Sequence, residues 1–166
     1  MTTPGPEMQD DQDAHVAGLL ERLPLFEALS EEGLRVLAGY MSVLDVYEGD
    51  VVFLEEEAGD YVLFVAEGSL DVRKRTSGGE LVGIATLQTG DSIGEMCLID
   101  PAPRSASVVA NEKCTLLTLS KEDFDNFVDT HPRSGVKVLR GIAKLVTRHL
   151  RATSSQLATY SGNPLE

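Results

Sequence analysis

The chain has 166 residues, of which 27 are acidic and 14 are lysine or arginine, and its formal net charge is -13. This length is sufficient for one domain with a hydrophobic core, and 42% of the residues are hydrophobic. The acidic excess argues against a general binder of nucleic acid or of anionic membranes, since both need a basic face, and no apolar segment approaches the roughly 20 residues of a membrane span.

The N-terminal part predicts a tail and two helices. Residues 1–13 are rich in Pro, Gly, Asp and Gln and are predicted to be disordered, so that the domain covers 14–160 and a second tail covers 161–166. The first residues also lack the cationic and apolar parts of a signal peptide, and we therefore expect a cytoplasmic protein. Apolar residues at helical spacing predict a helix that Pro24 ends, and a second helix follows with Ser30 as its N-cap.

Residues 43–120 have the pattern of short strands. Runs rich in Val, Leu, Ile and Thr alternate with glycine-containing turns, which predicts an all-β sandwich or barrel within this segment. The sequence SLDVRKR at 69–75 alternates apolar and polar residues and predicts a half-exposed strand. Cys97 and Cys114 both lie in apolar surroundings, and we expect two buried free thiols.

Helical signals return after residue 120. Ser120 and Asp123 form a weak capping box, and Pro132 ends that helix. A long helix is predicted over 133–159. Its apolar face either packs on the domain's own β-roll or pairs two copies in a homodimer, and the sequence leaves both open. This face consists of Leu139, Ile142, Ala143, Val146, Leu150 and Leu157.

The stretch GDSIGEMCLIDPAPRSASV at 90–108 contains a single cation, Arg104, in an acidic protein. Gly94 permits close backbone approach, and the residues after it resemble one short helical turn whose first amides form an anion site. Arg104 can supply a planar guanidinium to a phosphate, while Glu95 can accept a sugar hydroxyl. These groups suit a phosphorylated sugar. The alternative is that Arg104 pairs with Glu95 or Asp100 across a turn.

No catalytic or metal site is predicted. The three histidines, His15, His131 and His149, all lie outside the predicted β region, so that a cluster of metal ligands within the strands is not expected. Neither cysteine has a histidine nearby in the sequence. We therefore expect no enzymatic activity, no metal and no cofactor.

The stretch at 90–108 resembles the phosphate-binding cassette of the cyclic nucleotide-binding domain family, which includes bacterial catabolite activators and kinase regulatory subunits. The family pattern G-[DE]-x-[FI]-G-E appears at 90–95 as GDSIGE, and its P-R-[ST/A]-A appears at 103–106 as PRSA. The resemblance covers residues 20–158. It implies an α+β fold, with a jelly-roll-like antiparallel β-roll of about eight strands between N-terminal helices and a long C-terminal helix, and with a short helix in the cassette.

The resemblance also implies roles for individual residues. Arg104 would grip the cyclic phosphate, Glu95 would accept the ribose 2′-hydroxyl, and Gly94 would let the sugar approach. Backbone amides of the short turn and of Ser105 would complete the phosphate cradle. A serine at 105 favours cAMP, with cGMP as the alternative and cyclic dinucleotides still open. The implied ligand site consists of Gly94, Glu95, Met96, Cys97, Arg104, Ser105, Ala106 and Thr153.

The family covers the base with its C-terminal helix, and here two alignments compete. The Thr-Ser pair of catabolite activators matches Thr153 and Ser154, but an ungapped alignment places His149 or Leu150 at that site instead. The sequence also departs from the family pattern at Glu56, where the family usually has a turn glycine.

These features together predict a stand-alone regulatory module without a DNA-binding domain. It would bind a cyclic nucleotide and relay binding through its C-terminal helix to an unknown protein partner, or through a homodimer formed by that helix. The alternative is a degenerate scaffold domain that mediates protein–protein interaction without a ligand. No nucleic acid and no membrane are expected as partners.

Overall fold

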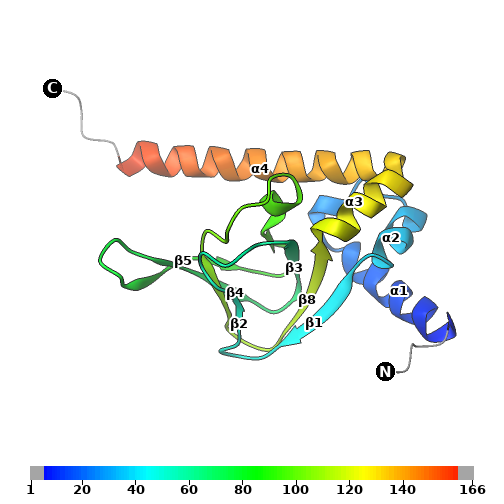
Figure 1. Cartoon of the computed structure of the whole chain (residues 1–166), viewed down its shortest axis with the longest axis horizontal. Helices are drawn as coiled ribbons and strands as arrows, with labels where there is room; N and C mark the ends of the chain where they lie inside the picture. Colours follow the sequence, from blue (N-terminus) through cyan, green and yellow to red (C-terminus); the bar gives the residue numbers. More distant parts are fainter. Residues whose placement is uncertain (1–5, 161–166) are drawn as a thin grey trace.

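The structure is a computed structural model that describes the backbone of residues 6–160 and the side chains of residues 11–155 and 157. In chain order the elements are α1 (Pro6–Leu20), η1 (Pro24–Phe26), α2 (Glu31–Ala38), β1 (Ser42–Val46), β2 (Val51–Phe53), β3 (Tyr61–Glu67), β4 (Leu70–Arg75), β5 (Leu81–Leu87), β6 (Ser92–Ile93), η2 (Glu95–Leu98), β7 (Ser107–Ala110), β8 (Cys114–Ser120), α3 (Lys121–Thr130) and α4 (Pro132–Tyr160). Helices α1 to α3 gather at one end of the strands, and α4 runs along one side (Figure 1).

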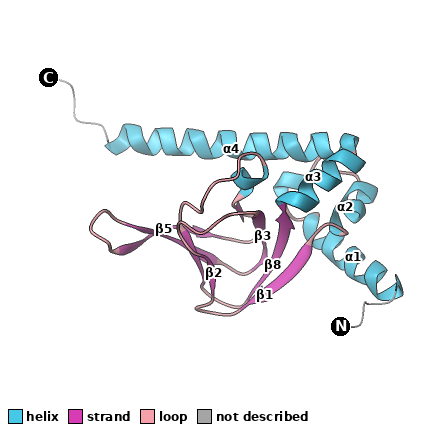
Figure 2. Cartoon of the chain, in the orientation of Figure 1, coloured by secondary structure: helices cyan, strands magenta, loops and turns pink. Residues whose placement is uncertain are grey.

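The eight strands form two antiparallel sheets of four, in the orders β1-β8-β3-β6 and β2-β7-β4-β5. Strands and helices are segregated rather than alternating along the chain, as Figure 2 shows. This arrangement confirms the predicted α+β fold with a jelly-roll-like β-roll between N-terminal helices and a long C-terminal helix.

The predicted caps are present. The Ser30 hydroxyl accepts from the Gly33 amide at the start of α2, and the Ser120 hydroxyl accepts from the Asp123 amide at the start of α3. Each bond satisfies an amide that has no partner inside its helix. The alternation of SLDVRKR is also confirmed, because Leu70 and Val72 are buried in β4 while the intervening residues are not.

The N-terminal boundary differs from the prediction. Helix α1 begins at Pro6, so that residues 6–13 continue a helix that was expected to start near residue 14. Proline fits the first helical position, and no glycine or proline interrupts residues 7–17. Residues 1–5 and the predicted tail 161–166 lie outside the described residues.

Two hydrophobic cores stabilise the fold. One lies between the two sheets and contains Phe53, Leu63 and Leu116. The other lies between the helices and the outer face of β3 and β8, and it includes Phe26, Phe64 and, from α4, Ile142. Because α4 joins the second core, its first half is held against the domain. No helix among the described residues is both long and apolar enough to cross a membrane.

Candidate functional site

The site begins at a backbone corner that requires glycine. Gly94 precedes η2 with a φ of 85°, in the left-handed region that side chains rarely adopt. A β-carbon there would collide with Nη1 of Arg104 and would lie 3.2 Å from the carbonyl oxygen of Tyr61. The glycine therefore sets the direction of η2 and makes room for the Arg104 guanidinium. The first amides of η2 have no partner inside the turn and face outward, as at any helix start.

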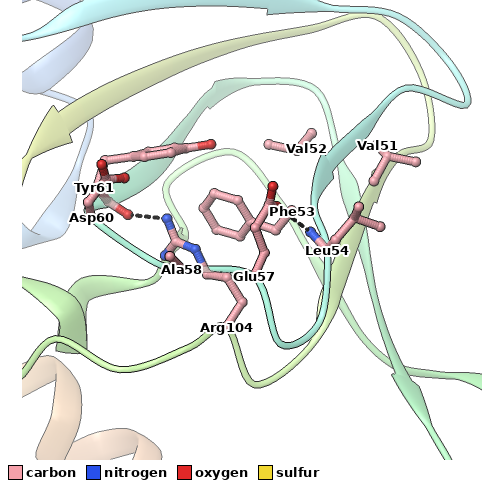
Figure 3. Close-up of a pocket in the computed structure, with 9 residues that line it drawn as sticks. All are labelled: Val51, Val52, Phe53, Leu54, Glu57, Ala58, Asp60, Tyr61 and Arg104. Atoms are coloured by element: carbon pink, nitrogen blue, oxygen red, sulfur yellow. Dashed lines mark hydrogen bonds between the residues drawn. The ribbon is translucent and has the colours of Figure 1, made fainter.

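The Arg104 side chain is 7% exposed and is held on several sides. Its Nη2 donates to the carbonyl oxygen of Tyr61 at 2.6 Å, as Figure 3 shows. Its guanidinium carbon lies 3.7 Å from the centre of the Phe53 ring and 4.8 Å from that of Tyr61. Aromatic rings and one carbonyl thus orient a buried cation.

The backbone of Arg104 is held by the loop that precedes β3. The Arg104 amide donates to the Glu57 carbonyl, and the Glu56 amide donates to the Arg104 carbonyl, both at 2.8 Å. Glu56 has a φ of 69° and is the one non-glycine residue with a positive φ in the described chain. This loop therefore keeps a backbone conformation that suits glycine, although a glutamate occupies the position.

The structure contradicts one of the two sequence interpretations of Arg104, the ion pair across the turn. Among the described residues, no carboxylate oxygen lies within 4.0 Å of its guanidinium, so the expected pairing with Glu95 or Asp100 is not formed. Glu95 instead faces α4, where its Oε1 lies 3.2 Å from Nδ1 of His149. Its side chain is 6% exposed, and this contact joins the short turn to the long helix.

These groups surround a cavity of about 850 Å³ between η2, the β-roll and α4. All eight residues that the sequence predicted for the ligand site line it: Gly94, Glu95, Met96, Cys97, Arg104, Ser105, Ala106 and Thr153. Residues separated by 59 positions in the chain, Gly94 and Thr153, are thus brought to one cavity.

Helix α4 contributes both candidates for the contact that covers the base. Thr153 and His149 lie one helical turn apart and both line the cavity, whereas Leu150 is 66% exposed and does not. The Thr153 hydroxyl donates to the His149 carbonyl at 3.0 Å. Its oxygen can therefore only accept from a further group.

Several cavity residues were missed by the sequence reasoning. They come from β2, β3, β4, β5 and α4, and they are Phe53, Phe64, Val72, Ile84, Leu87, Leu145 and Arg148. The alternation of β4 already placed Val72 on its buried face, and this signal could have included it. The remaining residues lie on β2, β3, β5 and α4, and only the pairing of the strands and the placement of α4 bring them to the cavity.

A second cavity, of about 360 Å³, lies on the other side of Arg104. Figure 3 shows its lining, in which Phe53 and Tyr61 lie beside Arg104 and the Glu57 carboxylate accepts from the Leu54 amide. Asp60 also belongs to this lining. The larger cavity also has carboxylates in its lining, those of Asp91, Glu95 and Asp100, but of the two cavities it alone is lined by η2 and by the second cation Arg148.

Burial also alters the titration of two neighbours of Arg104. Burial raises the pKa of the Cys97 thiol, and the positive charge of Arg104 opposes the rise. The pKa of Tyr61 is raised by burial in the same way, and Arg104 again opposes it. Both groups are therefore neutral at pH 7 beside the cation. Within the described part of the chain, no group of three or more His, Cys, Asp or Glu is arranged to hold a metal ion.

Comparison with known proteins identifies this architecture. Residues 43–131, more than half of the chain, match the family model of the cyclic nucleotide-binding domain. The chain belongs to the cyclic nucleotide-binding domain family. The match includes β1 to β8, η2 and Arg104, and therefore all of the strands that frame the cavity.

Relatives of this cyclic nucleotide-binding domain occur in regulatory proteins. The cyclic AMP receptor protein of Thermus thermophilus is 31% identical over 83% of this chain and 62% of its own length. A cAMP-dependent protein kinase regulatory subunit of Yarrowia lipolytica is 34% identical over 67% of this chain and 29% of its own length. The chain thus spans less than two thirds of either relative.

A solved structure matches nearly the whole domain. It is a cyclic nucleotide-binding domain from Methylobacillus flagellatus, 28% identical, with a TM-score of 0.80 over 95% of this chain and 88% of that one. The agreement includes α4 as well as the β-roll, which supports the position of the long helix over the cavity.

Proposed function

We propose that this domain binds a cyclic mononucleotide in the larger cavity, cAMP in preference to cGMP, and that α4 relays the binding to a partner protein. The observation that carries the proposal is the buried Arg104, which borders the cavity and has no carboxylate within ion-pair distance in the described chain. A desolvated cation of this kind is costly unless an anion joins it.

The cyclic phosphate would lie between Arg104 and η2. The Nη2 of Arg104 is engaged by the Tyr61 carbonyl, whereas Nη1 lies at the Gly94 corner, next to the first amides of η2. The guanidinium and the free amides at the start of η2 would together bind the exocyclic oxygens, and Met96, Ser105 and Ala106 line the same cavity. The Cys97 amide already donates to the Gly94 carbonyl.

The sugar and the base would extend from the phosphate toward α4. The Glu95 carboxylate has two oxygens, so that it can keep its contact with His149 and still accept a ribose hydroxyl. The Thr153 oxygen can only accept, and it would favour the amino group of adenine over the carbonyl oxygen that guanine carries at the same ring position.

The position of α4 supports the proposed relay. Its first half is anchored in the helical core, while Leu145, Arg148, His149 and Thr153 line the cavity. A ligand that binds more tightly when these residues cover it shifts the helix toward the covering position. We infer a binding and regulatory function without catalysis, with the output carried by a partner or by pairing of two α4 helices.

Replacement of Arg104 tests the proposal. Arg104→Ala should weaken cAMP binding by about 2–5 kcal/mol, since it removes the charged partner of a desolvated phosphate. Isothermal titration calorimetry with cAMP, cGMP and cyclic dinucleotides measures the change and the base preference together. Arg104→Lys keeps the charge but loses the planar donors, and it should show an intermediate affinity.

Arg35→Ala is the matched control, because Arg35 is exposed on α2 and its ion pair with Glu31 is on the surface. It should leave the isotherm unchanged. An Arg104→Ala protein that is folded by circular dichroism and binds cAMP as tightly as wild type would overturn the phosphate role. Absence of binding by wild type at high micromolar cAMP and cGMP would favour the scaffold interpretation.

A further inference from the structure

The charges of the domain are divided unequally between α4 and the rest. Helix α4 contains six of the 14 lysines and arginines and no aspartate or glutamate, whereas the other eight cations share the remaining chain with all 27 acidic residues. A strongly acidic protein therefore carries one purely basic element. That element is the one proposed to report ligand binding.

The six cations lie on a single face of the helix. We call them the basic row: Arg133, Lys137, Arg140, Lys144, Arg148 and Arg151. At about 100° per residue they fall within an arc of about 80° and span about 27 Å along the axis. All six are exposed, and the buried residues Val138 and Ile142 are on the opposite face. The basic row thus lies on the side of α4 away from the helical core, and Arg148 at its edge also lines the cavity.

Intramolecular pairing does not account for the row. Lys144 lies 3.6 Å from an oxygen of Glu27, and both side chains are largely exposed. Within residues 11–155, none of the other five cations forms an ion pair. Like charges at four-residue spacing destabilise an isolated helix, and one exposed pair with Glu27 offsets little of this cost.

An apolar row follows the cations along the same helix. Val136, Leu150 and Leu157 are 46%, 66% and 61% exposed, and together with the exposed Ala143 they recur every seven residues. A seven-residue apolar repeat beside a row of charges is the surface that a helix presents to a second helix.

We propose that this face of α4 docks an acidic, amphipathic helix of a partner protein. Carboxylates one turn apart on such a helix would match the spacing of the basic row, and its apolar residues would cover Val136, Leu150 and Leu157. A helix is about 10 Å wide and contacts the row alone, whereas a wider polyanion would also meet the surrounding acidic surface. The proposal specifies the kind of partner protein that the proposed function requires. It rests on the proposed function only for the coupling between docking and nucleotide binding.

Arg148 connects the two surfaces. It belongs to the basic row and also lines the cavity, directly before His149. A bound nucleotide that draws Arg148 or the helix toward the cavity changes the docking face as well. Linkage then requires that the acidic helix and the nucleotide alter each other's affinity by the same factor.

A designed peptide tests the surface directly. The probe is a fluorescein-labelled helical peptide of about 24 residues, with leucines at heptad spacing and glutamates beside them. Three comparison probes are a scrambled peptide of equal composition, a DNA duplex of similar length, and vesicles with about 30% phosphatidylserine. We expect the helical peptide to bind more tightly than every comparison probe, with an affinity that falls as salt rises.

Two triple variants locate the binding. The combined Lys137→Gln, Arg140→Gln and Lys144→Gln changes should lower peptide affinity by about tenfold or more. None of these three residues lines the cavity, so the affinity for nucleotide should not change. The control combines Arg22→Gln, Arg35→Gln and Lys113→Gln, which removes the same charge from other exposed sites and should leave peptide binding intact.

Several outcomes would overturn the proposal. The scrambled peptide could bind as tightly as the helical peptide, or the duplex or the vesicles could bind more tightly. The two triple variants could lose equal peptide affinity. Sedimentation could show that wild type self-associates and that the Lys137, Arg140 and Lys144 triple variant does not. A wild-type domain that binds the peptide but no nucleotide would refute the proposed function and leave the docking surface standing.

Discussion

At the scale of single residues, the site depends on side chains that are fixed before any ligand arrives. Arg104 is held by two aromatic rings, one carbonyl and two backbone bonds to the preceding loop. Little conformational entropy is then lost when an anion binds, which favours tight binding.

The Glu56 backbone tests how strongly this loop is strained. A non-glycine residue in the left-handed region costs about 1–2 kcal/mol, and glycine returns about 0.5–1 kcal/mol of that through the greater freedom of the unfolded chain. Glu56→Gly should therefore stabilise the domain by up to about 1 kcal/mol in urea unfolding. Glu56→Ala keeps the β-carbon and should give no gain. Equal midpoints for all three proteins would show that the loop is not strained.

The Cys97 thiol reports on the cavity. Because burial raises its pKa, the reactive thiolate forms at a higher pH than in a free cysteine. Alkylation by iodoacetamide at pH 8 should be slower than for a free cysteine and should accelerate as the pH is raised further. Saturating cAMP should slow the alkylation, because the bound nucleotide would cover the part of the cavity lining that contains Cys97. Mass spectrometry with Cys97→Ser as the control assigns the site, and rapid alkylation at pH 7 would contradict the expectation.

At the scale of elements, two glycines fix the position of α4. A β-carbon at Gly135 would lie 3.0 Å from the Cα of Val128 in α3, and one at Gly141 would collide with the carbonyl oxygen of Leu25 in η1. The close approach of α4 to α3 and η1 therefore requires that these two positions carry no side chain. The helix is packed in its first half and projects along the cavity in its second.

Gly141→Ala should move α4 and weaken the fold. Alanine improves helix propensity by about 1 kcal/mol, but the collision with backbone at Leu25 forces a shift that costs about 1–3 kcal/mol. Thermal unfolding should therefore show a net loss, and cAMP affinity should fall with it. Gly18→Ala is the matched control, since nothing lies within 4 Å of a β-carbon there, and it should raise stability. A gain in both variants would show that α4 does not rest on η1.

At the scale of the whole molecule, the larger cavity borders both hydrophobic cores. Phe64 belongs to the helical core and Val72 to the core between the sheets, and both line the cavity. A bound nucleotide would therefore stabilise the domain as a unit. At free cAMP about 100 times its Kd, the free energy of unfolding should rise by about 2.7 kcal/mol. Differential scanning fluorimetry measures the shift, and Arg104→Ala at the same cAMP concentration should show a much smaller one.

The sequence contained most of the information that positions this site. The two serine caps and the alternation in β4 are local signals, and the structure has each of them where it was predicted. The start of α1 was predicted too late, since composition is a weak guide where no breaker interrupts a helix.

Long-range geometry was not accessible from local patterns. The sequence could not distinguish His149 from Thr153, because residues four apart share a helix face and both line the cavity. Leu150 is rotated by about 100° from His149 and is exposed to solvent. The partner of Glu95 was likewise hidden, since 54 residues separate it from His149 and only the docking of α4 joins them.

The contact of Gly141 with η1 gives α4 a pivot. His149 lies about 12 Å beyond it and Tyr160 about 28 Å beyond it along the helix axis. If α4 tilts as a rigid rod about this point, a displacement at His149 is more than doubled at the far end. Under the proposed function the long helix would then work as a lever. Its short arm would contact the nucleotide, and its long arm would present the exposed Leu157 to a partner.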